Sequence, residues 1–165
     1  MNLGINNKVA LVTGSNRGTG LMIAERLATE GARVIFHSQA EGDSAAIAKQ
    51  VENASAVWGD ITNEQGSERV IRAVKELTDG VDILVNNYGT ADPGRWQTAT
   101  SEDWLTAYQK NTLSIVRMVQ GFTPDMIKTG WGRVVNLGTV GSTRPNKTSP
   151  QYYAAKGALA NMTVS

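Results

Sequence analysis

The sequence predicts an α/β protein built on a parallel β-sheet. Apolar runs of strand length alternate with longer segments whose apolar residues recur at helical spacing. A glycine-rich stretch joins the first apolar run, Val9 to Val12, to the first helical segment. Strict alternation of this kind indicates parallel strands joined by right-handed helical crossovers.

Five segments are predicted to be strands because they are rich in apolar and β-branched residues. They are Val9–Thr13, Arg33–Ser38, Ala54–Trp58, Ile83–Asn86 and Arg133–Leu137. The first is apolar over four consecutive residues, which is typical of a strand buried on both faces of a sheet.

Helices are expected between these strands. The first runs from Leu21 to Glu30 and is followed by Gly31, a residue suited to the position just after a helix. The second follows Asp43, a candidate cap. The third spans Glu64 to Leu77, where apolar residues lie on one stripe.

The fourth helix is expected to begin at 101–103, Ser-Glu-Asp, because acidic residues stabilise a helix N-terminus. It reaches toward Met118, and Gly121 and Pro124 predict a break or kink beyond it. The last helix runs from Gln151 to Ser165, where the chain stops without a capping Gly or Pro.

Length and composition favour one domain, residues 1–165. A net charge of +1 and a pI near 8.0 give no electrostatic argument for nucleic acid or an anionic membrane as a partner. The chain has no cysteine, and His37 is its only histidine, so a metal centre is not expected. It shows neither an apolar leader nor a run of membrane-spanning length, so a cytoplasmic protein is expected.

Tyr152 and Lys156 form a Tyr-x-x-x-Lys pair in the last predicted helix. Four residues are about one helical turn, so both side chains project from the same face. A positive ammonium beside a phenol favours the phenolate, which suits acid/base work on a substrate. Taken alone, such a pair is more often part of a solvated helix face.

The glycine-rich stretch has the spacing Gly14-x-x-x-Gly18-x-Gly20, between a strand and a helix. Glycines permit a tight turn and let the backbone approach a pyrophosphate, while the new helix offers unpaired N–H groups. In this context dinucleotide binding is favoured over a βα turn that binds nothing.

Five motifs in this order resemble the classical short-chain dehydrogenase/reductase family, and within it members similar to 3-oxoacyl-ACP reductase. They are Thr13-Gly14-x-x-x-Gly18-x-Gly20, Asp60, Asn86-Asn87-Tyr88-Gly89, Asn111 and Tyr152-x-x-x-Lys156. The resemblance covers Lys8 to Ser165. It implies a Rossmann-like, doubly wound parallel sheet with strand order 3-2-1-4-5 and a ligand crevice between the first and fourth strands.

Three departures from the family pattern stand out. Tyr88 replaces a small alanine where backbone and cofactor lie close. Thr139 stands where the family has its catalytic serine, with Ser142 as the alternative hydroxyl. The chain also ends at Ser165, before the last strands and the substrate-covering segment of the family. We therefore expect the C-terminal strands to be missing by truncation or, alternatively, a short variant that a partner chain covers.

The resemblance implies both a cofactor site and a catalytic site. Residues expected to bind the cofactor are Gly14, Ser15, Asn16, Arg17, Gly18, Gly20, Ser38, Asp60, Ile61, Asn87, Gly89, Tyr152 and Lys156. Those expected to be catalytic are Asn111, Thr139, Tyr152 and Lys156. Alternatives stay open for several of these residues. Asp60 is also a candidate helix cap and Asn111 a candidate solvent-facing residue. Arg17 is also a candidate surface arginine, and Thr139 a candidate strand-end residue. His37 and Gln39 are candidates for the adenosine end, although for His37 the favoured interpretation is an ordinary residue at the end of a strand.

Arg17 and Ser38 bear on the choice between NADP and NAD. An arginine in the glycine loop suits the 2′-phosphate that distinguishes NADP. NAD-preferring relatives place an acid at the end of the second strand, and the residue here is Ser38. NADP is therefore favoured over NAD.

The predicted function is NADP(H)-dependent interconversion of a carbonyl and a secondary alcohol in a small-molecule substrate. Tyr152 is expected to act as the general acid/base beside Lys156, Thr139 to polarise the carbonyl, and Asn111 to support a proton path. A homo-oligomer, dimer or tetramer, is expected. The alternative is a catalytically impaired dinucleotide-binding module or a fragment that needs a partner chain.

Overall fold

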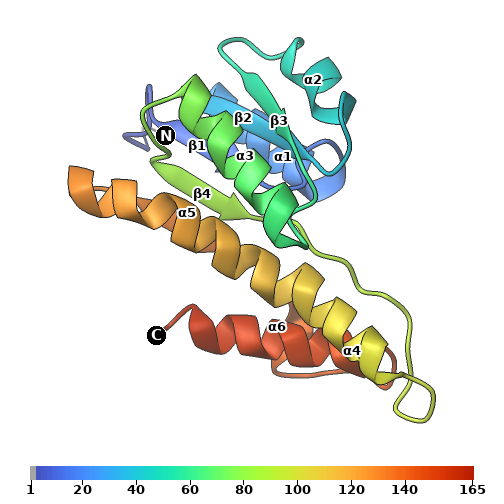
Figure 1. Cartoon of the computed structure of the whole chain (residues 1–165). Helices are drawn as coiled ribbons and strands as arrows, with labels where there is room; N and C mark the ends of the chain where they lie inside the picture. The colour runs from blue at the N-terminus through green and yellow to red at the C-terminus, as the bar shows by residue number, and fades with distance from the viewer. Residues whose placement is uncertain (1–2) are drawn as a thin grey trace.

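The centre of the fold is a five-stranded parallel sheet in the order β3-β2-β1-β4-β5 (Figure 1). The computed structural model describes residues 3–165. The strands are β1 (Val9–Val12), β2 (Arg33–Ser38), β3 (Ser55–Trp58), β4 (Ile83–Asn86) and β5 (Arg133–Asn136). The predicted strands, their parallel pairing and their order are confirmed, with ends that shift by at most one residue.

Helical segments connect the strands. They are α1 (Gly18–Thr29), α2 (Asp43–Ala48), α3 (Glu64–Leu77), α4 (Ser101–Tyr108), the π-helical turn η1 (Gln109–Leu113), α5 (Ser114–Thr129), the 3₁₀ turn η2 (Val140–Ser142) and α6 (Pro150–Met162). Three of them, α4, η1 and α5, follow one another directly and form the long rod that runs diagonally across Figure 1 beside α6.

Successive strand residues face two separate apolar cores, as the two-residue period of a strand requires. One core joins strand residues Val9, Leu11, Ile35, Val57 and Leu84 to Val70 and Val74 of α3 and Met118, Phe122 and Met126 of α5. The other joins Ala10, Val12, Val34, Phe36, Ile83 and Val85 to Ala24 of α1 and Ala48 of α2. Helices therefore cover both faces of the sheet and leave the carboxyl ends of the strands accessible along one edge.

Of the break or kink predicted at Gly121 and Pro124, the break is wrong, because α5 continues through both residues to Thr129. Buried Phe122 and Met126 hold the helix on the sheet on either side of the proline. Pro124 itself lies on the exposed face, where water can satisfy the carbonyl that the proline leaves without an N–H donor. The rod departs from regular α-helix earlier, in the π-turn Gln109–Leu113.

The ends of the helices confirm some of the predicted caps and contradict one. The predicted start at Ser101 is confirmed, with Thr100 and Asp103 forming a capping box. Gly31 follows α1 with a φ of +91°, as expected for a residue after a helix. Asp43 is not the cap of α2, because Gly42 precedes the helix and Asp43 is its first residue.

Two expected helices also begin or end elsewhere than predicted. Helix α1 begins at Gly18 rather than Leu21, so the last two glycines of the loop already belong to its first turn. Helix α6 begins at Pro150, since proline needs no N–H partner in the first turn, and it ends at Met162.

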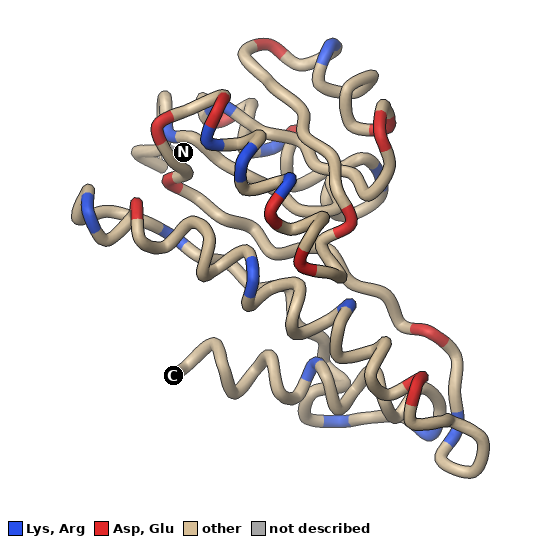
Figure 2. The backbone as a smooth tube through the Cα atoms, viewed as in Figure 1, with Lys and Arg blue, Asp and Glu red and all other residues tan. Residues whose placement is uncertain are grey.

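Charged residues are interspersed over the elements, with both signs present on α3 and α5 (Figure 2). Within residues 3–165, every helix is too short or too polar to cross a membrane.

Gly66 and Gly157 provide a matched pair for testing helix packing. A Cβ at Gly66 would lie 2.6 Å from the backbone nitrogen of Asp60, whereas a Cβ at Gly157 would meet no atom within 4 Å. We expect Gly66→Ala to lower the free energy of unfolding by about 2 kcal/mol through overpacking. Gly157→Ala should raise it by about 0.5–1 kcal/mol, because alanine loses less entropy in a helix. Urea denaturation of both variants measures the difference, and an unchanged midpoint for Gly66→Ala would contradict the packing described.

Candidate active site

The ends of β1 and β4 are joined by two polar side chains. The Thr13 hydroxyl accepts hydrogen bonds from the backbone N–H groups of Asn87 (3.1 Å) and Tyr88 (3.0 Å). The Asn87 amide donates to the carbonyls of Thr13 (2.9 Å) and Gly14 (3.1 Å). Thr13 is buried, so these bonds are shielded from water and fix the two loops against each other.

Three glycines of the adjoining loop are required for different reasons. Gly14 and Gly18 have φ angles of +62° and +56°, a region that glycine occupies without strain. A Cβ at Gly20 would collide with the Asn87 amide and the Gly14 carbonyl, so this position needs glycine for space. The loop is therefore built for close backbone packing at the switch point between β1 and β4.

His37 and Ser15 support the loop from below. Gly14 N–H donates to His37 Nδ1 (2.9 Å), and His37 Nε2 lies 3.0 Å from the Gly59 carbonyl. These partners fix a neutral ring with its proton on Nε2. Ser15 Oγ donates to the Val12 carbonyl (2.7 Å) and accepts from His37 N–H (2.9 Å). Burial lowers the pKa of His37 to about 4.

A cavity of about 350 Å³ opens above the carboxyl ends of β1, β2 and β4. Its walls are Gly14, Asn16, Arg17, Thr19, Gly20, Gln39, Ala40, Asp43, Asn87, Tyr88, Gly89 and Thr90. The first turn of α1 begins at this cavity, and among residues 3–165 its N-terminus receives no side-chain cap from Arg17. Unpaired N–H groups at a helix N-terminus favour an anion, and this cavity is the natural place for a pyrophosphate.

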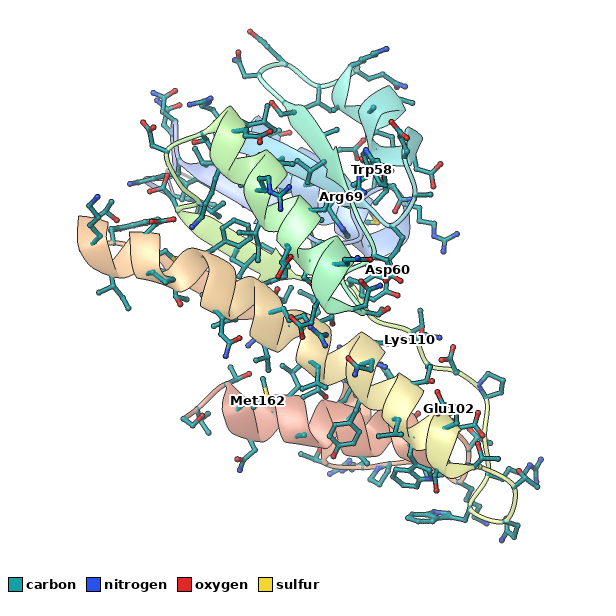
Figure 3. The ribbon with its side chains drawn as sticks, viewed as in Figure 1. Trp58, Asp60, Arg69, Glu102, Lys110 and Met162 are labelled. Carbon is teal, nitrogen blue, oxygen red and sulfur yellow. The ribbon has the colours of Figure 1, made fainter. Side chains whose placement is uncertain are left out.

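Asp60 lies just after β3, beside the first turn of α3 (Figure 3). Its carboxylate accepts hydrogen bonds from Thr62 N–H and Oγ1, Asn63 Nδ2 and Gln39 Nε2. Burial raises the pKa of Asp60, but these bonds outweigh that effect and leave the pKa below its usual value. The cap of α3 is Asn63, which accepts from Gly66 N–H, so the capping alternative for Asp60 is wrong.

Asn111 lies inside the π-turn and is fully buried, which rules out the solvent-facing alternative. Its Nδ2 donates to the carbonyls of Ala107 and Thr90 (both 3.0 Å), and its Oδ1 accepts from Thr90 N–H (3.1 Å). The side chain therefore ties the loop after β4 to the helical rod. Such π-turns occur frequently at functional sites.

Lys156, Asn111 and Gly89 meet at one point. A Cβ at Gly89 would lie 2.6 Å from Asn111 Oδ1 and 3.4 Å from Lys156 Nζ. Lys156 is only 3% exposed, and its ammonium donates to the Leu137 carbonyl (2.7 Å). Burial lowers the pKa of Lys156. Three residues from distant parts of the sequence thus converge beside the cavity that Gly89 lines.

The two candidate hydroxyls after β5 differ in what they already bind. Thr139 Oγ1 accepts from Gly141 N–H (3.2 Å), which leaves its own proton free to donate. Ser142 Oγ donates to the Lys156 carbonyl (3.1 Å), so its proton is used within the fold. Tyr152 precedes Lys156 by one turn of α6, and its ring meets Tyr153 edge-on at 5.2 Å. Of the two hydroxyls, therefore, Thr139 keeps the proton that is still able to donate.

Comparison with known proteins agrees with the family resemblance that the sequence motifs indicate. The family model for short chain dehydrogenases matches residues 8–165. The chain belongs to the short-chain dehydrogenase family. It is 35% identical over 164 residues to the 3-oxoacyl-(acyl-carrier-protein) reductase FabG of Vibrio cholerae, covering 99% of this chain and 67% of that protein. It is 33% identical over 159 residues to the Escherichia coli reductase of the same name, covering 96% and 65%.

Two solved structures of the family superpose closely on the chain. The NADP-bound 3-oxoacyl-(acyl-carrier-protein) reductase of Agrobacterium tumefaciens has a TM-score of 0.89 at 33% identity, covering 96% of this chain and 62% of that one. The L-sorbose reductase of Gluconobacter frateurii, complexed with NADPH and L-sorbose, has a TM-score of 0.92 at 30% identity with the same coverage. The chain therefore spans about two thirds of the length of its short-chain dehydrogenase relatives.

Six of the thirteen predicted cofactor residues of this short-chain dehydrogenase line the cavity. They are Gly14, Asn16, Arg17, Gly20, Asn87 and Gly89. Ser15, Ser38 and Ile61 are buried. Gly18 begins α1, Asp60 follows β3, and Tyr152 and Lys156 lie on α6. The Ser38 hydroxyl bonds to the Ala40 carbonyl and to Ser44, so its side chain faces α2 and not the cavity. A direct cofactor contact by the Ser38 side chain does not fit this arrangement.

Sequence reasoning missed part of the cavity wall. Thr19, Ala40, Asp43 and Thr90 line it but carry no motif that would mark them. The alternation of β2 contains a signal, because a buried Ser38 places Gln39 at the rim. His37, a candidate for the adenosine end, lies near the end of β2 and is buried beneath the loop, which agrees with the favoured interpretation of an ordinary strand-end residue.

The His37 contacts make an acid-sensitive fold. The folded pKa of about 4 lies below the ordinary 6.5, so the unfolded chain takes up the proton first as pH falls. Stability should therefore decrease by about 2 kcal/mol between pH 7 and pH 5, a window in which ordinary carboxylates contribute little. Urea denaturation across this range measures it. His37→Asn should be less stable at pH 7 but nearly flat over the window, and an equal slope in both proteins would contradict the assignment.

Proposed function

We propose that the chain is an NADP(H)-dependent oxidoreductase that interconverts a carbonyl and a secondary alcohol in a small molecule. One observation carries the proposal: Gly89, Asn111 and Lys156 converge beside the glycine-lined cavity, one helical turn from Tyr152. A dinucleotide site and an acid/base pair therefore adjoin. Relatives bound to NADP or NADPH support the choice of cofactor.

The residues present fit a dinucleotide. The first turn of α1, with Gly14 and Gly20, would hold the pyrophosphate, and Arg17 would face the 2′-phosphate. Asp60 and the Ile61 backbone would take the adenine, and Lys156 the nicotinamide ribose. When bound, NADP(H) donates or accepts the hydride.

Each catalytic side chain then has a distinct task. Tyr152 donates a proton to the carbonyl oxygen during reduction and removes it from the alcohol in the reverse direction. The Lys156 ammonium favours the phenolate that this cycle produces. The free proton of Thr139 donates to the same carbonyl oxygen, and Asn111 fixes the loop against which the substrate would lie.

A homo-oligomer, dimer or tetramer, is part of the proposal. This part of the proposal rests on the family resemblance. The cytoplasmic location expected from the sequence stays a prediction.

Tyr152 provides the sharpest test of the reaction. Tyr152→Phe removes only the hydroxyl, so it should reduce NADPH-dependent ketone reduction by at least about a hundredfold while NADPH affinity stays within a factor of about two. Tyr153→Phe is the matched control and should retain turnover. Activity is followed by NADPH absorbance with a panel of ketones and aldehydes, and affinity by calorimetry.

The outcomes separate the two candidate roles of the chain. Comparable turnover in Tyr152→Phe would move the acid/base role to another residue. Tight NADPH binding without turnover of any substrate in the unmodified protein would favour a dinucleotide-binding module that does not catalyse.

Arg17 and Asp43 should control the choice between NADPH and NADH, because their opposite charges line the same cavity. We expect the protein to bind NADPH more tightly. Arg17→Glu should narrow or invert this preference, and Asp43→Asn should widen it, since a carboxylate disfavours a nearby phosphate. Fluorescence titration of both cofactors against each variant measures the ratio, and equal affinities in the unmodified protein would refute the NADP assignment.

A further inference from the structure

The side-chain amide of Gln39 is fully hydrogen-bonded at the rim of the cavity. Its Nε2 donates one proton to Asp60 Oδ1 (2.9 Å) and the other to the Tyr88 hydroxyl (2.9 Å). Its Oε1 accepts from Ile61 N–H (3.2 Å). Because a carboxylate can only accept and a backbone N–H can only donate, these partners fix the amide orientation. Both donors and the acceptor of Gln39 are therefore satisfied within the protein.

Asp60 and Ile61 together form a short recognition edge. A carboxylate oxygen accepts at one position, and a backbone N–H donates beside it. The complement of this edge is a planar group that carries an NH₂ donor next to an acceptor. A carboxamide has that pattern, and so does adenine, whose amino group lies beside a ring nitrogen. The Gln39 amide thus makes the two bonds that an adenine would make at the same place.

Access to this edge is limited by the residues around it. Ile61 is buried, and both Gln39 and Tyr88 form the cavity wall next to it. Tyr88 stands where the family has a small alanine, and its hydroxyl binds the second amide proton of Gln39. Tyr88 therefore holds the Gln39 amide over Asp60 from the side of β4.

We propose that Gln39 is an internal latch: its amide occupies the adenine-recognition edge of Asp60 and Ile61, and the adenine of the cofactor replaces it. The inference rests on the proposed function, since it concerns the adenine end of that cofactor site. Binding exchanges two hydrogen bonds of Gln39 for two of adenine. The net gain is consequently smaller than at an open site, and Gln39 and Tyr88 set the affinity.

The experiment compares Gln39→Ala with Gln50→Ala by calorimetry. Gln50 is an exposed glutamine whose amide bonds only to the nearby Ala46 carbonyl, so it serves as the matched control. The ligands are NADPH and its analogue with hypoxanthine in place of adenine, which presents an oxygen acceptor where adenine has its amino donor. The analogue cannot use the Asp60 edge and so does not need to open the latch.

Gln39→Ala should bind NADPH about threefold to tenfold more tightly than the unmodified protein, as expected for two competing hydrogen bonds. Affinity for the hypoxanthine analogue should change little, so the preference for adenine grows. Gln50→Ala should match the unmodified protein for both ligands. Tyr88→Phe, which leaves the Gln39–Asp60 bond intact, should give a smaller gain in NADPH affinity.

A direct readout follows the Gln39 side chain in the unmodified protein, and the variant serves only to assign its signals. In ¹⁵N spectra of the unmodified protein, the Gln39 side-chain NH₂ signals, assigned by their loss in Gln39→Ala, should move toward solvent-exposed values when NADPH is added. Unchanged or weaker NADPH binding by Gln39→Ala, or Gln39 signals that stay in place at saturation, would overturn the latch. Failure of NADPH to bind any of the proteins would instead refute the proposed function, and the latch with it.

Discussion

The site depends on the junction of β1 and β4, the switch point at which the order of the strands in the sheet reverses. Thr13 accepts from two backbone N–H groups of the next loop, and Asn87 returns two hydrogen bonds to the first. A buried donor that loses its partner costs about 1–3 kcal/mol, so these bonds hold both loops in one geometry. Gly20 makes the junction tight, because it leaves room for Asn87 against the Gly14 carbonyl.

The catalytic end is joined to this junction through the helical rod. Asn111 binds the Thr90 backbone at both its carbonyl and its N–H, and Thr112 Oγ1 donates to the Ala155 carbonyl of α6 (2.9 Å). The rod therefore contacts both the loop after β4 and the helix that carries Tyr152 and Lys156. Figure 1 shows α6 lying along the rod over much of its length. Two neighbouring residues of the π-turn therefore bind two different parts of the site: Asn111 binds the loop after β4, and Thr112 binds α6.

The sheet could be predicted from the sequence because its strands are short, apolar and bounded by clear breaks. Strand order came from the family resemblance, and the structure confirms it. The helix break was mispredicted because local rules for Gly121 and Pro124 ignore the packing of Phe122 and Met126. The π-turn at Asn111 leaves no periodic signal in the sequence, so its tertiary bonds could not be foreseen.

The sequence predicted which residues lie near the site better than it predicted where their side chains point. Ser38 was placed correctly at the end of β2, but its side chain faces Ser44, while the next residue reaches the rim. Asp60 was found by its position after β3, whereas its partners Gln39 and Tyr88 come from two other loops. Only the strand order brings these three residues together.

Several polar groups that a cofactor would use have hydrogen-bond partners within the protein. Asp60 accepts four hydrogen bonds, Ile61 N–H has an acceptor in Gln39, and Lys156 donates to the Leu137 carbonyl. Among the described residues, the buried side-chain atoms without a partner are Asn86 Oδ1 and Gln151 Oε1, neither of which belongs to a cavity-lining residue. At Asp60, Ile61 and Lys156 a ligand must therefore exchange hydrogen bonds, whereas the first turn of α1 offers it N–H groups without a side-chain cap. Because an exchange gains little at each contact, selectivity rests on how well the ligand reproduces the pattern it replaces.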